Sequence, residues 1–357
     1  MTEKLLNQGG YGCVYFPAKS CSPSSSSGIE NKDFVTKVQM KDLNIEQEQQ
    51  IGELVKSIVD YSSFFAPVVE TCPVQEKDIN TSLLDKDGKP CNITKKAKER
   101  NKSLIMMRIP YLPDGDFKKH ITTSSTAELI SCYRHLLLGV EHLINRKIVH
   151  YDLKADNILF NNRLNNPIII DFGMSIDMTK ILNQNITINL LERYFYVYEP
   201  KYSLWPLDVH LLCLIADNVE IISMNEIEKM CYKYVVNAFK GKGQNGGMEI
   251  QPAQPQQPQV PLQQPQPPQV PPAIPQVPQQ QVPQVQPVLN KKLDINALSP
   301  IQKRFYDKSI AYFGKFANAP KNDVIATLLK NWQTWDLYGI HYMFYKRSEP
   351  GKRSNPV

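Results

Sequence analysis

The stretch His150-Tyr151-Asp152-Leu153-Lys154-Ala155-Asp156-Asn157 decides the fold of this chain, together with Asp171-Phe172-Gly173 further on. The first motif brings a carboxylate, an ammonium group and an amide close together, and the second adds a carboxylate fourteen residues after Asn157. Transfer of a phosphoryl group needs a carboxylate to orient the attacking hydroxyl, and oxygen ligands for Mg²⁺ on the triphosphate. The two motifs supply both, so they predict phosphoryl transfer from a nucleotide.

The residues of the two motifs have distinct predicted roles. Asp152 would face the substrate hydroxyl as the catalytic base, and Lys154 would neutralise charge on the moving phosphoryl group. Asn157 is predicted to take part in catalysis and, with Asp171, to hold the metal ions. A polar helix cap followed by a turn explains single residues of this set, but not all of them at this spacing.

A glycine-rich run near the N-terminus, residues 7–14, fits the phosphate-binding pattern G-x-G-x-x-G-x-V with asparagine in place of the first glycine. Asparagine tolerates left-handed backbone better than most residues, so the turn survives this change. Such clusters also occur in flexible turns, but the position ahead of the other motifs favours nucleotide binding. The residues predicted to contact the nucleotide here are Asn7, Gly9, Gly10, Tyr11, Gly12 and Val14.

Lys37 ends the run Phe34-Val35-Thr36-Lys37, a predicted strand from which a lysine reaches the α- and β-phosphates. Such a lysine needs a carboxylate from the helix predicted over residues 45–59, where Glu46, Glu48 and Glu53 are candidates. Glu48 is preferred, because apolar residues follow it at plus three, seven and ten and form a buried stripe beside it. Glu53 is the alternative.

The adenosine part of the nucleotide is assigned to the apolar strand SLIMMRIPYL, residues 103–112, and the loop after it. Met106 and Met107 lie where an adenine-contacting hinge is expected, and Met107 is taken as the contact. Methionines in an apolar strand are also ordinary core residues. Asp116 is predicted to meet the ribose.

The chain reads as one two-lobed α+β domain interrupted by a low-complexity insertion. Residues 1–110 predict a small β-rich lobe and hinge, and residues 111–240 a mainly helical lobe that begins with a periodic helix over about 126–146. Residues 241–290 are rich in Pro and Gln, which cannot bury enough apolar surface to fold, so a disordered insertion is predicted. Residues 291–357 supply the remaining helices.

These motifs resemble the eukaryotic-type serine/threonine protein kinase family over residues 5 to about 200. The resemblance implies a β-rich N-lobe over a helical C-lobe, with ATP and Mg²⁺ as cofactors between them and protein serine or threonine hydroxyls as substrates. The segments YFYVYEPKYSLWPLDVHLL and NWQTWDLYGIHYMF are similar to kinases of large cytoplasmic DNA viruses, such as iridoviruses and mimiviruses. This similarity implies virion or host proteins as substrates.

Three departures from the family pattern leave alternatives open. Tyr151 replaces the usual arginine after His150, Tyr198-Glu199-Pro200 replaces Ala-Pro-Glu, and the chain stops soon after Trp335-Asp336. The buried aspartate that ties the catalytic loop to a central helix is Asp208 by spacing or Asp336 by its Trp-Asp-x-Tyr surroundings, and Asp336 is preferred. The second hypothesis for the whole chain is an impaired pseudokinase or scaffold that uses its surface and proline tract. A small-molecule kinase is a third.

Composition and charge limit the remaining function classes. A basic excess of six, spread along 357 residues, does not predict nucleic-acid binding. Seven scattered cysteines without a CxxC pair predict buried reduced thiols in a cytoplasmic protein. No apolar run is long enough to span a membrane, and the first ten residues lack a secretory signal. The proline-rich strings predict a groove-type binding partner.

Overall fold

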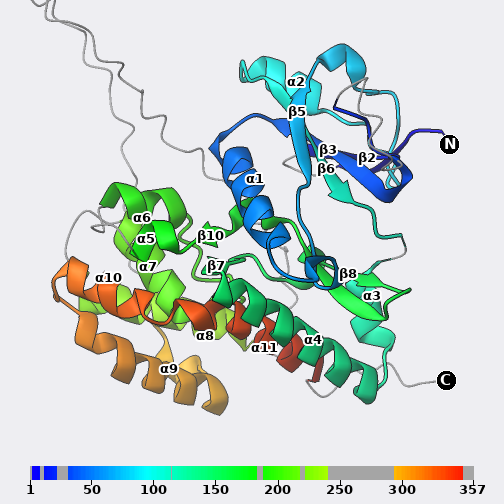
Figure 1. Cartoon of the computed structure of the whole chain (residues 1–357). Coiled ribbons are helices and arrows are strands. Elements are labelled where there is room, and N and C mark those ends of the chain that lie inside the picture. The colour runs from blue at the N-terminus through cyan, green and yellow to red at the C-terminus, as the bar shows by residue number, and fades with distance from the viewer. Residues whose placement is uncertain are drawn as a thin grey trace, which may run out of the picture.

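The computed structural model describes residues 2–8, 12–21, 31–113, 115–182, 188–217, 222–239 and 293–348. Two regions stack on each other, one built around a β-sheet and the other built mainly from helices (Figure 1). This arrangement confirms the predicted α+β, two-lobed protein-kinase fold. The predicted insertion at 241–290 lies outside the described residues, so its predicted disorder stays a prediction.

The sheet of the first lobe has five antiparallel strands in the order β1-β2-β3-β6-β5. The strands are β1 (Lys4–Gln8), β2 (Gly12–Phe16), β3 (Phe34–Met40), β5 (Glu70–Val74) and β6 (Leu104–Pro110). Lys37 of β3 pairs with Val14 on one side and with Met107 on the other. Directly paired residues point to the same face of a sheet, so these three predicted nucleotide residues share one face.

Helix α1 (Leu43–Lys56) joins the two lobes (Figure 1). Asp42 begins it as an N-cap, because its carboxylate accepts hydrogen bonds from the backbone N–H groups of Asn44 and Ile45. Ile45 packs against the sheet with Met107, whereas Ile51 belongs to the core of the helical lobe. The helix is therefore held from both sides, which fixes the carboxylates that it carries.

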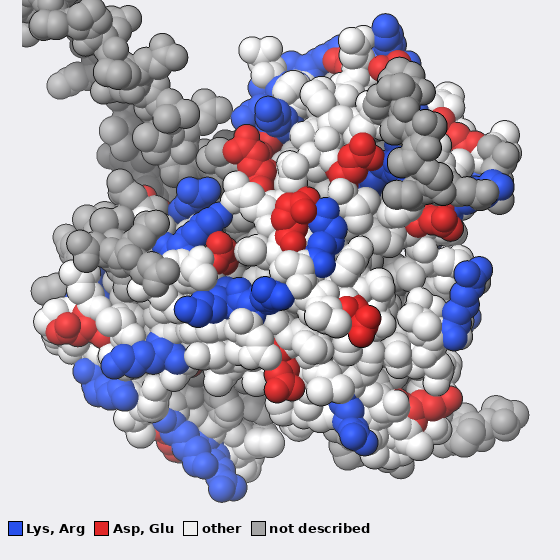
Figure 2. All heavy atoms as spheres, viewed as in Figure 1, with Lys and Arg blue, Asp and Glu red and all other residues white. Residues whose placement is uncertain are grey.

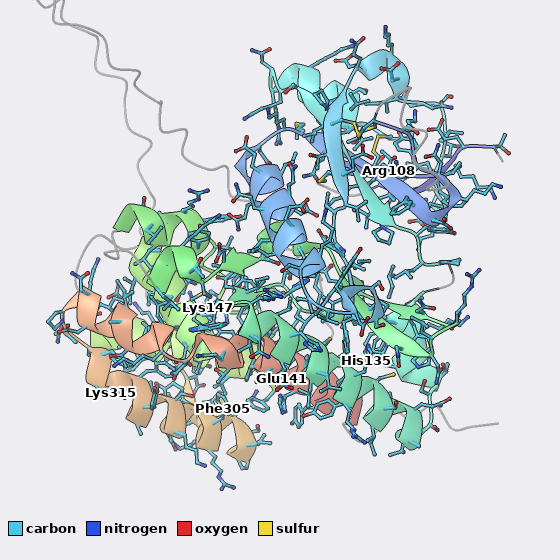
Figure 3. The ribbon with its side chains drawn as sticks, in the orientation of Figure 1. Arg108, His135, Glu141, Lys147, Phe305 and Lys315 are labelled. Atoms are coloured by element: carbon cyan, nitrogen blue, oxygen red, sulfur yellow. A yellow bond between two sulfur atoms is a disulfide. The ribbon has the colours of Figure 1, made fainter. Side chains whose placement is uncertain are left out.

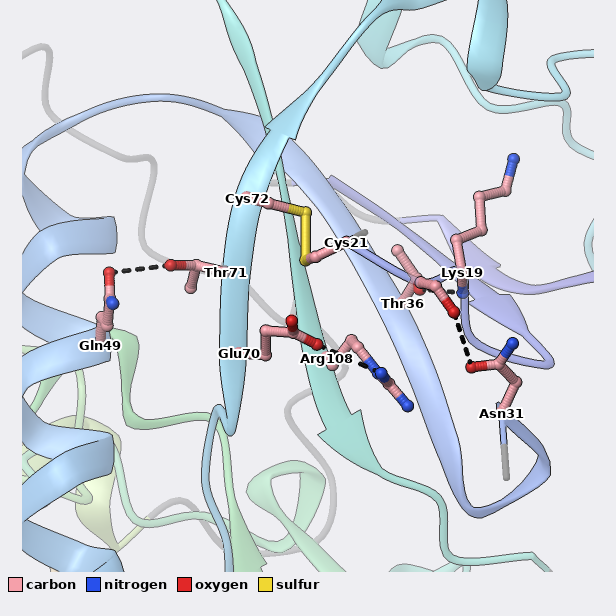
Figure 4. The surroundings of a disulfide bond; sticks show 10 residues. Lys19, Cys21, Asn31, Thr36, Gln49, Glu70, Thr71, Cys72 and Arg108 are labelled. Carbon is pink, nitrogen blue, oxygen red and sulfur yellow. Dashed lines mark hydrogen bonds and ion pairs between the residues drawn. A yellow bond between two sulfur atoms is a disulfide. The ribbon is translucent and has the colours of Figure 1, made fainter. Parts of the chain in front are cut away.

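The cysteines correct one expectation of the sequence. Cys13 is bonded to Cys91 and Cys21 to Cys72, with Cα atoms 5.9 and 5.7 Å apart, and Figure 4 shows the bond between Cys21 and Cys72. The prediction of reduced thiols is therefore wrong for these four residues. The partners are 78 and 51 residues apart in sequence, and only the folding of residues 75–103 back over β2 brings the first pair together. That segment contains helix α2 (Ile93–Glu99), whose Ile93 and Ala97 are buried beside Cys13. The cysteine content consequently no longer indicates a reducing compartment.

The second lobe is built on helix α4 (Thr126–Asn145), close to its predicted range. A capping box begins it: Ser125 accepts from the Glu128 backbone, and the Glu128 carboxylate accepts from the Ser125 backbone. The other helices of this lobe are α3 (Phe117–Thr123), α5 (Thr179–Leu182), α6 (Ile188–Tyr194), α7 (Leu207–Asp217), α8 (Met224–Ala238), α9 (Pro300–Phe313), α10 (Lys321–Leu329) and α11 (Trp335–Ser348). Figure 3 labels Phe305 of α9, which is half-buried and packs against the core of this lobe, and His135 and Glu141 along α4.

Short strands position the predicted catalytic loop between the lobes. Strand β7 (Ile148–Val149) pairs with β10 (Ile176–Asp177), and β9 (Asn166–Ile170) lies between β4 (Phe65–Ala66) and β8 (Ile158–Asn161). The chain between β7 and β8 contains Asp152 and Asn157, and the chain between β9 and β10 contains Asp171. Both motifs therefore emerge at the boundary between the lobes.

Acidic and basic side chains are mixed over both lobes on the face shown in Figure 2. No helix in the described part of the chain has the length and apolar character needed to cross a bilayer.

Candidate active site

Lys37 is the centre of an ion-pair network between the lobes. Its Nζ lies 3.0 Å from Asp171 Oδ1 and 3.5 Å from Glu48 Oε1. Glu48 is the carboxylate that the sequence argument preferred, whereas Glu53 pairs with Lys56 at 2.7 Å and Glu46 is exposed. Three residues from β3, α1 and the loop after β9 thus meet at one point.

Burial and charge act against each other in this network. Burial alone would lower the pKa of Lys37, but Asp171 and Glu48 more than offset it and raise that pKa. The Lys37 ammonium lowers the pKa of Asp171, while burial raises the pKa of Glu48. Asp171 therefore stays an anion whose side chain is 45% exposed and open to a cation.

Asp152 is held by three side chains. Lys154 Nζ donates to its Oδ2 at 2.8 Å, and Asn157 Nδ2 donates to the same atom at 2.9 Å and to the Asp152 carbonyl at 2.8 Å. The Tyr202 hydroxyl donates to Oδ1 at 2.7 Å. Because both bonds of Asn157 use its amide nitrogen, its side-chain oxygen takes no part in holding Asp152.

Asp336 anchors the predicted catalytic loop through the backbone of His150 and Tyr151. Its carboxylate accepts from the backbone N–H of His150 at 2.6 Å and of Tyr151 at 2.9 Å, and the residue is 5% exposed. Asp208 instead accepts from the Asn331 amide at 3.0 Å and does not bond the loop. The structure thereby gives the anchoring position to Asp336, at the start of α11.

Tyr151 shows why this anchor matters. Its φ of 70° lies in the left-handed region that a bulky residue adopts at a cost of about 1–3 kcal/mol. Hydrogen bonds hold this conformation on both sides of the residue. The Tyr151 N–H donates to the Asp336 carboxylate, and the Trp205 indole N–H donates to the Tyr151 carbonyl at 2.5 Å. The side chain is buried against Phe195, Trp205 and Trp335.

The glycine-rich run is described only in part. Asn7 and Val14 are paired across β1 and β2, while Gly9, Gly10 and Tyr11 lie outside the described residues. Gly12 is required by packing, because a Cβ there would lie 2.2 Å from the Val38 carbonyl oxygen. The nucleotide-binding role of this run stays a prediction.

The remaining two residues predicted to contact the nucleotide, Met107 and Asp116, make other contacts in the structure. Met107 is fully buried between the sheet and α1, with Ile45 and Val68, so its side chain serves the core. Asp116 is exposed and caps α3 by accepting from the Lys119 N–H at 3.0 Å. Their predicted contacts with adenine and ribose are not tested by these positions.

A magnesium site made by the chain alone is not present among the described residues, which contain no cluster of three His, Cys, Asp or Glu side chains. The donor set still fits Mg²⁺ held jointly with phosphates, because Asn157 offers an amide oxygen and Asp171 a partly exposed carboxylate. Kinase sites bind Mg²⁺ in this shared way.

The profile of the protein kinase domain family matches residues 4–194, more than half of the 357 residues. The chain belongs to the protein kinase domain family.

Individual relatives match over shorter segments. The chain is 32% identical over 76 residues to the "Probable cell division control protein 7 homolog 2" of Encephalitozoon cuniculi, covering 21% of this chain and 22% of that protein. It is 28% identical over 76 residues to the cell cycle serine/threonine-protein kinase hsk1 of Schizosaccharomyces pombe, covering 21% and 15%. Among solved structures, the PK-1 kinase of Cydia pomonella granulovirus is 17% identical with a TM-score of 0.32, covering 49% and 54%. The chain thus spans 22% and 15% of the lengths of these two relatives.

Proposed function

We propose that this protein is a serine/threonine protein kinase that transfers the γ-phosphoryl group of ATP to protein hydroxyls. The observation that carries the proposal is the meeting of Lys37 and Asp171, 3.0 Å apart, beside an Asp152 held by Lys154 and Asn157. A lysine for phosphates, a carboxylate for metal and a second carboxylate for the acceptor are the parts that phosphoryl transfer needs.

Each residue has a role that follows from its position. Lys37, fixed by Glu48, would bind the α- and β-phosphates, and Asn157 and Asp171 would hold Mg²⁺. When bound, Mg²⁺ neutralises phosphate charge and orients the triphosphate. Asp152 would accept a hydrogen bond from the acceptor hydroxyl and then its proton, while Lys154, 2.8 Å from Asp152, would balance charge on the transferred group.

The narrower proposals concern the substrates, the place of action and a binding partner. The similarity of two segments to kinases of large DNA viruses supports virion or host proteins as substrates, and the cytoplasm or the virion as the place of action. The Pro/Gln-rich insertion supports a partner with an aromatic-lined groove, because polyproline segments enter such grooves in extended form.

The test is incubation of the purified full chain with radiolabelled ATP, Mg²⁺ and a mixture of protein acceptors, followed by phosphoamino-acid analysis. Label on serine or threonine is expected, and Lys37→Met should abolish it. ATP binding without any transfer would instead assign the chain to the pseudokinases. Label found on added aminoglycosides or lipids, and not on protein, would assign it to the small-molecule kinases.

A further inference from the structure

The segment 199–206, which follows the family match to residues 4–194, reaches into the candidate active site. From this segment the Tyr202 hydroxyl donates to Asp152 Oδ1 at 2.7 Å. The opposite oxygen, Oδ2, is already bonded by Lys154 and Asn157. The proposed catalytic base is therefore held by donors on both of its oxygens.

Hydrogen bonds to the backbone fix Tyr202 in this position. Three consecutive carbonyl oxygens of its segment each accept a hydrogen bond from a side chain of α7 or α8. The pairs are Lys201 with Asn237, Tyr202 with the ring of His210 at 3.0 Å, and Ser203 with Tyr234 at 3.4 Å. The Tyr202 N–H donates to the Glu199 carbonyl at 2.9 Å, so the backbone is fixed on both sides of the residue.

The ring and hydroxyl of Tyr202 are equally constrained. The ring packs edge-on against Trp205 at 5.0 Å, and Trp205 bonds the Tyr151 carbonyl, next to Asp152 in the chain. Burial and the Asp152 carboxylate raise the pKa of Tyr202, so the hydroxyl remains a proton donor at any ordinary pH. A donor that is held rigidly and stays protonated can orient a carboxylate, but it cannot take a proton from a substrate.

We propose that Tyr202 is a positioning residue for transfer, which holds Asp152 so that the second lone pair of Oδ1 faces the acceptor hydroxyl. This inference rests on the proposed role of Asp152 as the base. A carboxylate oxygen accepts two hydrogen bonds, so Tyr202 occupies one position and leaves one for the substrate. The fixed geometry lowers the cost of orienting the base at each turnover.

Chain segments outside the family match hold Tyr202 and the loop that contains Asp152. Helices α7 and α8 hold the carbonyls around Tyr202, and α11 supplies Asp336 beneath the loop. The family match ends at residue 194, so these segments complete the site from beyond it.

The primary test is steady-state kinetics of Tyr202→Phe, which removes the hydroxyl and keeps the ring on Trp205. We expect kcat to fall about tenfold, since hydrogen bonds to charged groups are worth about that factor or more. KM for ATP and for the protein acceptor should stay within about twofold, because Tyr202 contacts neither. Replacement by 4-aminophenylalanine keeps a donor at the same place and should restore the rate.

The matched control is Tyr133→Phe, which removes a hydroxyl bonded to His341 Nε2 at 2.8 Å, away from the site. Its kcat should not change, and both variants should keep a single cooperative melting transition. An unchanged or increased kcat in Tyr202→Phe, or a rise in acceptor KM alone, would overturn the inference. So would phosphate on Tyr202 of the wild-type protein by mass spectrometry, because the residue would then be an acceptor.

The double variant with Asp152→Asn separates this inference from the proposed function. Asp152→Asn alone tests the base, by single-turnover transfer. In that background Tyr202→Phe should have little further effect, because Tyr202 acts through the carboxylate. A full additional tenfold loss would place the action of Tyr202 elsewhere and contradict the inference, even if the chain is an active kinase.

Discussion

The two lobes hold the residues of the candidate active site by different means. The β lobe has a small core, around Cys13, Val38 and Met106, and adds two disulfides across it. The helical lobe has a much larger core, rich in aromatic side chains, and holds its loop by hydrogen bonds from the buried Asp336. A lobe with little apolar surface to bury gains most from covalent links, whereas a larger lobe can use buried polar contacts.

The largest expected effect comes from breaking the anchor of the helical lobe. Asp336→Ala leaves the N–H groups of His150 and Tyr151 buried without a partner, and each such group costs about 1–3 kcal/mol. We expect the free energy of unfolding to fall by about 2–6 kcal/mol, measured by urea denaturation. Asp208→Ala is the matched control and should cost about 1 kcal/mol, because its carboxylate bonds the Asn331 side chain and its own backbone N–H instead of the loop. Equal effects of the two variants would show that Asp336 is not the anchor.

The next effect comes from the covalent links of the β lobe. The double variants Cys13→Ser/Cys91→Ser and Cys21→Ser/Cys72→Ser should each lose about 2–4 kcal/mol of stability, since each link closes a long loop in the unfolded chain. Thermal melting with and without dithiothreitol checks this. Reductant should lower the melting temperature of the wild type and leave a variant without all four cysteines unchanged. Four free thiols at these positions in the native protein, counted by mass spectrometry after alkylation, would refute the links.

A smaller effect is expected on the pH dependence of stability, from the buried His210 of the helical lobe. Burial lowers the pKa of His210 to about 4, whereas the unfolded ring titrates near 6.5. Its contribution to stability is thus complete above pH 6.5 and is lost as the pH falls towards 4, because only the unfolded chain binds a proton in this range. The wild type should lose up to about 3 kcal/mol relative to His210→Gln between pH 7 and pH 4. Parallel stability curves would show that folding does not lower the pKa of His210, and would contradict this prediction.

The smallest effect is expected from the activation segment. Tyr151 stands where regulated kinases carry an arginine for a phosphorylated residue, and a neutral hydroxyl cannot replace that charge-assisted contact. The structure buries Tyr151 against Phe195 and Trp205, so packing holds this region. Phosphatase treatment, or the double variant Thr179→Ala/Thr187→Ala, should change the transfer rate less than about twofold. A tenfold loss would mean that a basic residue such as Arg193 recognises a phosphate.

The sequence was sufficient to predict those residues of the candidate site that lie in motifs of short spacing. The motifs around Asp152 and Asp171, and the helical stripe beside Glu48, led to residues that the fold brings together. Such motifs are readable because the chemistry requires particular side chains at short separations.

Contacts over long separations could not be read in the same way. Cys13 and Cys91, Asp152 and Tyr202, and His150 and Asp336 meet only after whole elements have packed. The Trp-Asp-x-Tyr surroundings were the one local signal for Asp336, and nothing in the spacing of Tyr202 distinguishes it from other aromatic residues. The cysteines were misjudged because scattered thiols look alike in sequence whether or not they pair.

The central claim is that residues from the two lobes form one centre for phosphoryl transfer, with Asp152 as the base. The most direct test compares transfer and ATP binding in Asp152→Asn. The asparagine keeps the shape of the loop but cannot accept the proton, so transfer should fall about 100-fold or more. The ATP dissociation constant should stay within about threefold, because the Lys37 and Asp171 contacts remain. Near-normal transfer by Asp152→Asn, at a melting temperature equal to that of the wild type, would contradict the account.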